Sequence, residues 1–481
     1  MDFPLLVGGQ EKPASNNAIF KRINAETDEL ISRAAAATID DAVSAADAAQ
    51  SAFSLWSSYG PNARREVLRK AAEIIDERKE DFVTQMMAET GATAPWAAFN
   101  CMLAANMFRE AAAITTQING DVIPSDRPGT ISMAVREPAG VVLGIAPWNA
   151  PIILGARAIA TPLACGNTVI LKSSEVCPGV HYMIGKAVQD AGAPAGAINV
   201  ISNAPEDAGK IVAALIEHAA VRRVNFTGST RVGRIIAETC ARALKPVLLE
   251  LGGKAPLIVL DDADIDAAVD AAIFGGYANQ GQICMSTERV IVDQTCADQF
   301  VEKLATRAVA LPSGPNTEQV VISHMVDCKA VEHAKALVDD ATEKGAALIA
   351  GGHANGLIMQ ATIVDNVTQN MRLYHEESFG PILSIIRVSD EDEAIRVAND
   401  SEYGLSSAVF GRDASRALAI ARRVKSGICH VNGPTVHDEP QMPFGGVGAS
   451  GYGRFGGAAG IDAFTERKWI TINTEKPHYP F

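Results

Sequence analysis

Short, almost wholly apolar segments alternate with helical segments through the middle of the chain, and this pattern constrains the fold more than any other feature. The segments expected to form strands are 141–146, 168–171, 198–201, 221–226 and 247–251. Helical segments separate them at 151–163, 178–191, 206–217 and 230–243. Strands that are apolar on both faces and are joined through helices form a parallel sheet with helices on both sides. Ligands of such sheets bind at the carboxyl ends of the strands, near the point where the strand order reverses.

A second series of apolar segments follows and extends the same architecture. Its expected strands lie near 257–260, 289–292, 382–387, 406–410 and 428–431. The 481 residues leave room for about three units at roughly 150 residues each. We therefore expect two α/β domains with a cleft between them.

The remaining segments predict helices near the start of the chain and two separate strands. Residues 28–118 are expected to be mostly helical, with helices over 34–54, 64–89 and 95–117. Residues 119–137 and 468–473 show the alternation of a strand. Two isolated strands of this kind can form a small sheet that serves subunit contact.

Charge and cysteine content exclude several classes of protein. The formal net charge of −14 argues against nucleic acid or an anionic membrane surface as the partner. The eight cysteines are scattered, with no Cys-x-x-Cys pair, so zinc sites and a disulfide framework are not expected. The first residues lack the basic region of a secretory signal, and a reduced cytoplasm is the expected location. Residues 138–156 are uncharged and long enough to span a bilayer, but Pro147 and Pro151 would interrupt a helix, which predicts a buried strand running into a helix.

One cysteine lies in an unusual decapeptide, residues 277–286, which carries no charged side chain. Gly281 precedes Cys284 by three residues, and glycine permits a tight turn or the close approach of another group. This setting suits a nucleophile held ready for a substrate. A buried structural cysteine is the alternative, and the decapeptide alone leaves both open.

Four polar groups follow predicted strands of the first sheet. Gly228 and Ser229 open a helix, where free N–H groups can bind phosphate, although ordinary turn chemistry explains them equally well. Residues 172–175 could bond ribose hydroxyls and, through a carboxylate, favour NAD over NADP, or could form a solvated surface pair. Burial would raise the pKa of Glu250 towards that of a base. The Asn149 amide could stabilise an oxyanion or cap the following helix.

Several motifs occur together in one order and spacing. They are Pro147-Trp148-Asn149, Lys172-Ser173-Ser174-Glu175, Phe226-Thr227-Gly228-Ser229-Thr230, Glu250-Leu251-Gly252-Gly253-Lys254, Gly281-Gln282-Ile283-Cys284, Glu376-Glu377-Ser378-Phe379-Gly380-Pro381, Val431-Asn432-Gly433 and Pro443-Phe444-Gly445-Gly446. Over nearly its whole length the chain closely resembles the NAD(P)-dependent aldehyde dehydrogenase superfamily. The resemblance implies an α/β fold with a Rossmann-type NAD-binding domain over 1–118 and 139–250 and an α/β catalytic domain over 251–460. It also implies a small β oligomerisation element over 119–138 and 461–481, and hence a homodimer or homotetramer.

The resemblance also implies a role for each matching residue. Cys284 looks like the nucleophile, Asn149 with the Cys284 N–H like the oxyanion holder, and Glu250 like the base that activates water. Relatives that pass the acyl group to coenzyme A tend to lack that base, which favours hydrolysis here. The matching cofactor contacts, for NAD and with no metal required, are Trp148, Lys172, Ser174, Glu175, Gly228, Ser229, Glu377 and Phe379.

The residues expected at the substrate entrance are Trp96, Arg157, Ile283, Met285 and Phe444. Their apolar and aromatic character suits a flat ring. Arg157 lies on an otherwise apolar helix and could meet a polar ring substituent, or could pair with a protein carboxylate. The chain looks most like bacterial salicylaldehyde and benzaldehyde dehydrogenases, so oxidation of such an aromatic aldehyde is expected. The alternatives are a vanillin-type, aliphatic or semialdehyde dehydrogenase, or a catalytically silent dinucleotide-binding or structural relative.

Overall fold

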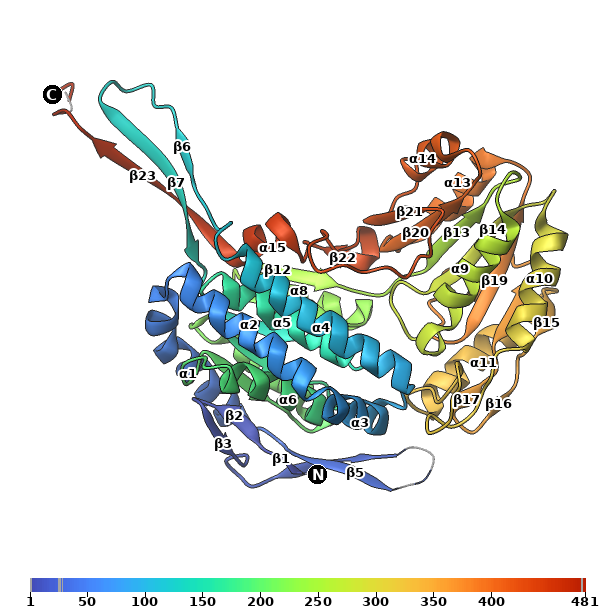
Figure 1. Cartoon of the computed structure of the whole chain (residues 1–481), viewed down its shortest axis with the longest axis horizontal. Coiled ribbons are helices and arrows are strands. Elements are labelled where there is room, and N and C mark those ends of the chain that lie inside the picture. Colours follow the sequence, from blue (N-terminus) through green and yellow to red (C-terminus); the bar gives the residue numbers. More distant parts are fainter. Residues whose placement is uncertain (1, 25–26, 28, 477–478) are drawn as a thin grey trace.

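The computed structural model describes residues 2–24, 27, 29–476 and 479–481 and contains two large sheets covered by helices (Figure 1). The first sheet has eight strands in the order β22-β12-β11-β8-β9-β10-β2-β3. Its five central strands are parallel: β8 (Val141–Ile145), β9 (Thr168–Lys172), β10 (Ile198–Ile201), β11 (Val221–Thr227) and β12 (Val247–Glu250). Antiparallel strands complete the edges: β2 (Leu5–Val7), β3 (Gln10–Lys12) and β22 (Gly451–Tyr452). The predicted parallel strands are confirmed.

The strand order of this sheet reverses around β8, because the chain adds β9 and β10 on one side and then β11 and β12 on the other. The intervening helices are α5 (Pro151–Ala164), α6 (Pro178–Asp190), η1 (Pro205–Asp207), α7 (Ala208–Glu217) and α8 (Thr230–Arg242). Val142 belongs to one apolar cluster, whereas Val141 and Leu143 belong to another. Successive side chains of a strand point to opposite faces, so both faces of the sheet are covered, as the apolar pattern predicts.

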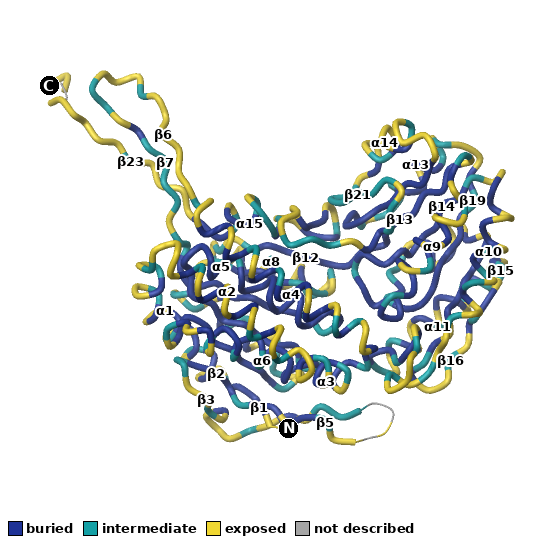
Figure 2. Tube along the Cα trace, viewed as in Figure 1, coloured by how far each residue is buried: buried dark blue, intermediate teal, exposed yellow. Residues whose placement is uncertain are grey.

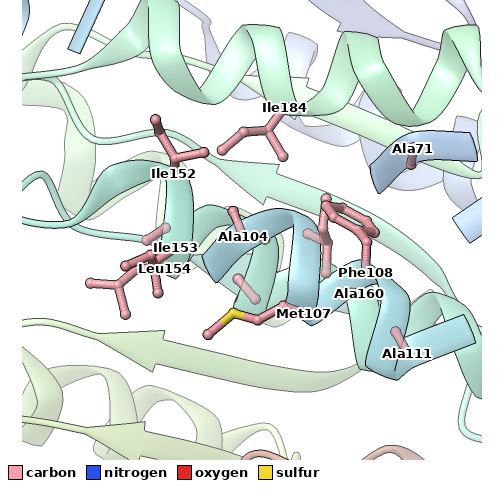
Figure 3. Close-up of a cluster of buried hydrophobic side chains, with 14 of the residues drawn as sticks. Ala71, Ala104, Met107, Phe108, Ala111, Ile152, Ile153, Leu154, Ala160 and Ile184 are labelled. Atoms are coloured by element: carbon pink, nitrogen blue, oxygen red, sulfur yellow. The ribbon is translucent and has the colours of Figure 1, made fainter. Parts of the chain in front are cut away.

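Four helices from the first part of the chain pack onto this domain. They are α1 (Ile39–Ser58), α2 (Pro61–Glu77), α3 (Lys79–Thr90) and α4 (Ala94–Ile114). Figure 3 shows Met107 and Phe108 of α4 beside Ile152 and Ile153 of α5, all in one buried cluster. This packing fixes α5, which follows directly after Asn149.

The second sheet has seven strands in the order β15-β18-β19-β14-β13-β20-β21. These strands are β13 (Ala255–Val259), β14 (Thr287–Asp293), β15 (Ala347–Ala350), β18 (Thr362–Asp365), β19 (Ile382–Val388), β20 (Ser406–Phe410) and β21 (Ile428–Val431). Its helices are α9 (Ile265–Tyr277), α10 (Ala297–Val309), α11 (Cys328–Glu343), α12 (Arg372–His375), α13 (Glu391–Asn399) and α14 (Ala414–Ala421). The five predicted strands are confirmed. The sequence reading missed β15, β18 and the small hairpin of β16 (Ala354–Asn355) and β17 (Ile358–Met359).

A third sheet projects from the body of the molecule and is largely exposed (Figures 1 and 2). It consists of β6 (Asp121–Ile123), β7 (Thr130–Pro138) and β23 (Thr465–Asn473), with β7 and β23 paired antiparallel along their whole length. The prediction that two distant segments form a separate small sheet is confirmed. Its role in oligomerisation and the domain boundaries given above stay predictions.

The sequence reading was wrong at two places near the start of the chain. Residues 30–35 form strand β5 (Leu30–Ala35), not helix, and pair with β1 (Asp2–Phe3) and β4 (Ile19–Ile23). The first helix begins only after Thr38, whose side chain forms a capping box with Asp41. The expected helix over 64–89 is two helices, because Arg78 leaves the helical conformation at φ −97° and ψ 20°.

The uncharged segment 138–156 behaves as predicted, since it runs through β8 and into α5. Within the part of the chain that the structure describes, no helix has the length and apolar character to cross a membrane. The last two short helices, η3 (Gly448–Ser450) and α15 (Gly457–Phe464), lie between β21 and β23.

Candidate active site

The segment before Cys284 is a tight left-handed turn packed against a distant loop. Asn279, Gln280 and Gly281, the end of η2 (Ala278–Gly281), have φ values of 49°, 57° and 71°. A Cβ added at Gly281 would lie 2.0 Å from the Gly380 carbonyl oxygen. Both roles predicted for Gly281, the turn and the close approach, are therefore observed. The turn orients the Cys284 segment, which Ser286 supports by donating from Oγ to the Gly281 carbonyl at 2.9 Å.

Asn149 is held against this segment by hydrogen bonds of both its side chain and its main chain. Its side-chain Nδ2 donates to the Gln282 carbonyl at 2.9 Å, and its own carbonyl accepts from Asn279 Nδ2 at 3.0 Å and Trp96 Nε1 at 3.1 Å. Ala150, not Asn149, occupies the N-cap position of α5, so the helix-capping alternative is wrong. Because an amide has two N–H donors, one remains for an oxyanion next to Cys284.

The surroundings of the Cys284 thiol disfavour its ionised form. Burial raises the thiol pKa well above its usual range, and the carboxylates Glu250 and Glu377 raise it further, while Arg157 opposes them. The thiolate is the nucleophilic form of cysteine. A reaction at Cys284 therefore requires removal of the thiol proton.

Glu250 ends β12 with its carboxyl group fully buried. Its Oε1 accepts a hydrogen bond from the Gly446 N–H at 3.3 Å, and no described residue bonds to its Oε2. Burial raises the pKa of Glu250 to about 8. A carboxyl group whose pKa lies near the working pH is suited to general base catalysis, as the sequence predicts.

An apolar cavity of about 590 Å³ opens onto the Cys284 side chain. All five residues expected at the substrate entrance line it together with Asn149. Leu103 on the predicted helix of Trp96 and Val436 in the loop 432–444, both segments expected at the entrance, also line it. The prediction missed the further apolar lining residues Ile153, Leu154, Phe274, Val320 and Val321. Trp96 and Phe99 stack at 5.5 Å between ring centroids, and Phe99 is 38% exposed, so Phe99 serves the cavity wall and not the core. Ligand pockets of this kind are mostly apolar with a few placed polar groups.

Arg157 has a protein partner within this cavity wall. It forms an ion pair with Asp438, and the two side chains are only 6% and 9% exposed. Its guanidinium also lies 4.0 Å from the centroid of the Phe444 ring. The alternative of a protein carboxylate partner is the one observed. Asp438 escaped the sequence reading because it lies 281 residues from Arg157 in a loop without secondary structure.

The predicted cofactor residues at the ends of β9 and β11 lie at the carboxyl ends of two central strands of the first sheet. These two strands flank β8, where the strand order reverses. Lys172 forms an ion pair with Glu175, which also accepts from Asn203 Nδ2 at 3.0 Å. The Lys172 side chain is 6% exposed, so the pair is not the solvated surface pair considered above. Ser174 Oγ accepts from the Val176 N–H at 3.2 Å, which stabilises the turn that follows β9.

Gly228 and Ser229 lie between β11 and the N-terminus of α8. Ser229 Oγ accepts from the Val232 N–H at 3.4 Å and thereby caps that helix. The first N–H groups of a helix point outward without helical partners and can bind phosphate. The geometry is compatible with the predicted phosphate contact.

Two of the remaining cofactor candidates, Glu377 and Phe379, belong to a turn after α12, and the third, Trp148, lies between β8 and α5. Glu377 accepts from the Gly253 N–H at 2.8 Å, and burial raises its pKa to about 7. Phe379 has a φ of 46°, and its ring meets Trp148 edge-on at 5.8 Å between centroids. This turn thus brings the predicted residue Phe379 against Trp148, and Glu377 lies close enough to Cys284 to raise the pKa of its thiol.

A buried carboxylate that the sequence reading missed holds this turn. Glu288 accepts from the Ser378 N–H at 2.9 Å, from the Phe379 N–H at 3.0 Å and from Lys254 Nζ at 2.7 Å. A charged residue inside the apolar strand β14 was the available signal, because such a residue must be paired.

Comparisons with known proteins agree with this geometry. Residues 12–470 match the model of the aldehyde dehydrogenase family. The chain is 59% identical over 481 residues to a vanillin dehydrogenase of Pseudomonas fluorescens, with 100% of both chains covered. It is 50% identical over 470 residues to a salicylaldehyde dehydrogenase of Pseudomonas putida, with 97% of both covered.

A solved structure is similarly close. The crystal structure of a salicylaldehyde dehydrogenase from Pseudomonas putida G7 complexed with salicylaldehyde superposes with a TM-score of 0.99 at 49% identity, covering 100% of both chains. A cysteine, an amide and a raised-pKa carboxyl group therefore meet in a chain that matches one family over nearly its full length. The protein belongs to the aldehyde dehydrogenase family and is an aldehyde dehydrogenase.

Proposed function

We propose that this enzyme oxidises hydroxylated aromatic aldehydes of the vanillin type to carboxylic acids, with NAD as the oxidant. The observation that carries the proposal is the cavity of about 590 Å³ that reaches Cys284 and is lined by Trp96, Phe99, Phe274 and Phe444. Flat aromatic walls favour a flat aromatic ring through offset or edge-to-face contacts. The wall has one cation, Arg157, whose charge is balanced by Asp438, so a dicarboxylic or phosphorylated aldehyde finds no free positive charge among these lining residues.

The vanillin alternative is favoured over the salicylaldehyde expectation. The relative with 59% identity is a vanillin dehydrogenase, whereas the salicylaldehyde dehydrogenase relative has 50% identity. Arg157 lies on α5 seven residues beyond Ala150, which is roughly 10 Å along a helix. A hydroxyl para to the aldehyde would point away from the reacting carbon and towards Arg157. An ortho hydroxyl would stay beside the reacting carbon.

The proposed reaction begins at Cys284. The thiol gives its proton to solvent water that enters through the cavity, and its sulfur forms a bond to the aldehyde carbon while the carbonyl π electrons move to oxygen. Asn149 Nδ2 and the Cys284 N–H would hold that oxyanion, and preorganised donors of this kind typically contribute about 3 kcal/mol to the rate. The product of this step is a thiohemiacetal on Cys284.

The residues at the carboxyl ends of β9 and β11 fit a bound NAD. Lys172 and Glu175 offer a donor and an acceptor for ribose hydroxyls, and the capped start of α8 offers N–H groups for the pyrophosphate. The Glu175 carboxylate would repel a 2′-phosphate, which favours NAD over NADP. NAD bound there would supply a hydride acceptor, and loss of a hydride from the thiohemiacetal carbon would convert the adduct on Cys284 to a thioester.

Glu250 would complete the cycle as a general base. It takes a proton from water, the water oxygen attacks the thioester carbon, and the carbon–sulfur bond breaks to release the acid. Its raised pKa of about 8 makes it a strong enough base for this step.

Steady-state kinetics would test the substrate assignment. We expect kcat/KM to decrease in the order vanillin, salicylaldehyde, benzaldehyde and hexanal, with NADH as the product. If hexanal exceeds the aromatic aldehydes, the aromatic assignment fails; if salicylaldehyde exceeds vanillin, the para-hydroxyl argument fails. Cys284→Ala should abolish turnover, and full activity in that variant would overturn the proposed role of Cys284, whatever the substrate.

A further inference from the structure

The ion pair between Arg157 and Asp438 is unusual because both charges are buried beside the candidate base. The two side chains are 6% and 9% exposed. Removing two charges from water costs several kcal/mol per ion, so a buried pair is weak evidence for a stabilising role. Another role must account for placing these charges in the wall of the substrate cavity.

The pair is linked to Glu250 through the loop that holds that carboxyl group. The Arg157 guanidinium lies 4.0 Å from the Phe444 ring centroid and 5.9 Å from that of Phe455. Phe444 lies two residues before Gly446, whose N–H bonds to Glu250 Oε1 at 3.3 Å. Arg157 therefore fixes the segment that supplies the hydrogen bond to the base.

The charges around Glu250 come from several elements. Arg157 of α5 lowers its pKa most among them, Arg454 after β22 acts in the same direction, and Asp438 acts in the opposite direction. The thiol of Cys284 is a further titratable group that interacts with Glu250. The two members of one ion pair therefore act on the base with opposite signs.

Two carboxylate oxygens beside the pair have no partner among the described residues. They are Glu250 Oε2 and Asp438 Oδ1, both fully buried. Each carboxylate has one oxygen occupied, by Gly446 N–H and by Arg157 respectively. Glu250 therefore has one oxygen, Oε2, available for a proton. The positive charge of Arg157 and the negative charge of Asp438 both act on this carboxyl group.

We infer that Arg157 and Asp438 are positioning residues that set the readiness of Glu250 to accept a proton during acyl-enzyme hydrolysis, in addition to shaping the cavity wall. The inference rests on the proposed role of Glu250 as the base. Arg157 stabilises the ionised base, and Asp438 moderates that effect so that the base stays strong. Removing either member alone should shift the titration of Glu250, and the two shifts should have opposite signs.

The test follows the decay of the acyl-enzyme directly as a function of pH. Single turnovers with benzaldehyde, which has no hydroxyl to meet the pair, are quenched in acid, and the thioester is quantified by intact-protein mass spectrometry. Asp438→Asn should move the midpoint of the pH dependence down by roughly one to two pH units, because it removes a like charge and leaves the opposite charge of Arg157 unbalanced, and an opposite charge nearby lowers a carboxyl pKa by about that amount. Arg157→Met should move it up, and the double variant should return it towards the wild-type midpoint.

Three controls separate the possible failures. Asp392→Asn breaks an exposed pair with Arg423, 54% and 81% exposed, and should leave the midpoint unchanged. Glu250→Gln should remove the pH dependence; if it does not, the proposed function of Glu250 fails. An unshifted midpoint in Asp438→Asn, or shifts of the same sign in both single variants, would overturn the inference itself. If Arg157→Met does not fold, Asp438→Asn and the double variant still decide the question.

Discussion

Glu288→Gln offers the sharpest test of how the turn carrying Glu377 and Phe379 is built. The wild-type carboxylate accepts from Lys254 Nζ, from Ser378 and from Phe379, and the Lys254 side chain has no exposed surface. The neutral amide leaves that ammonium group without a counter-charge. Breaking a buried pair by removing one partner costs about 3–5 kcal/mol, a large part of the roughly 5–15 kcal/mol that stabilises a typical protein.

The same substitution should weaken NAD binding more than aldehyde binding. The Lys254 ammonium group should attract the amide oxygen, which turns the amide nitrogen towards the Ser378 and Phe379 N–H groups. The left-handed Phe379 then loses a bond that holds its conformation. A lost hydrogen bond to a charged acceptor costs about 1.5–3 kcal/mol, which corresponds to an increase in Kd for NAD of at least tenfold. Thermal unfolding and fluorescence titration with NAD would measure the two effects.

A double variant separates the charge from the turn. Lys254→Met with Glu288→Leu removes both charges, and replacing a buried pair by apolar side chains is often neutral for stability. We expect this variant to recover much of the lost Tm while its NAD affinity stays low, because the turn still lacks its acceptor. A Glu288→Gln protein with wild-type Tm and wild-type NAD affinity would refute the reasoning.

Three further predictions concern the base, the thiol and the projecting sheet. Acyl-enzyme hydrolysis should fall about tenfold per pH unit below the Glu250 pKa of about 8 and level off above it, since only the ionised carboxylate accepts a proton; a flat profile from pH 6 to 9 would contradict this. In a Cys328→Ser background, which removes an exposed thiol, the rate of Cys284 alkylation by iodoacetamide should still increase with pH at pH 9, because burial raises the thiol pKa. A rate that reaches its plateau below pH 8 would contradict this. Trp469→Glu should convert an oligomer to monomer in light scattering, because that side chain on β23 is 77% exposed; an unchanged mass would argue against the oligomerisation element.

The parallel sheets could be predicted because their central strands are wholly apolar, which is a signal that each segment carries by itself. Strand β5 could not be predicted from the sequence, because Ala34 and Ala35 resemble the start of the alanine-rich helix. Only the Thr38 capping box marks where that helix begins. Partners far apart in sequence were also missed: Asp438 and Glu288 gain their roles from contacts across the fold. Arg157 could be singled out as a buried charge, but its sequence neighbours do not say which group neutralises it.

The position of Cys284, the proposed nucleophile, depends on the segment through which the chain passes from the first large sheet to the second. In the sequence this segment is visible only as the motif of residues 250–254. Glu250 ends the last central strand of the first sheet, and after three residues the chain reaches Lys254 at the start of the second. A Cβ at Gly253 would lie 2.2 Å from the Cys284 carbonyl oxygen, so any larger residue there would displace the cysteine. The Gly253 N–H also donates to Glu377 at 2.8 Å. One short segment therefore sets the relative positions of the proposed base Glu250, the proposed nucleophile Cys284 and the turn proposed to contact NAD. This explains why the same five-residue motif carries a carboxylate, a glycine at 253 and a lysine.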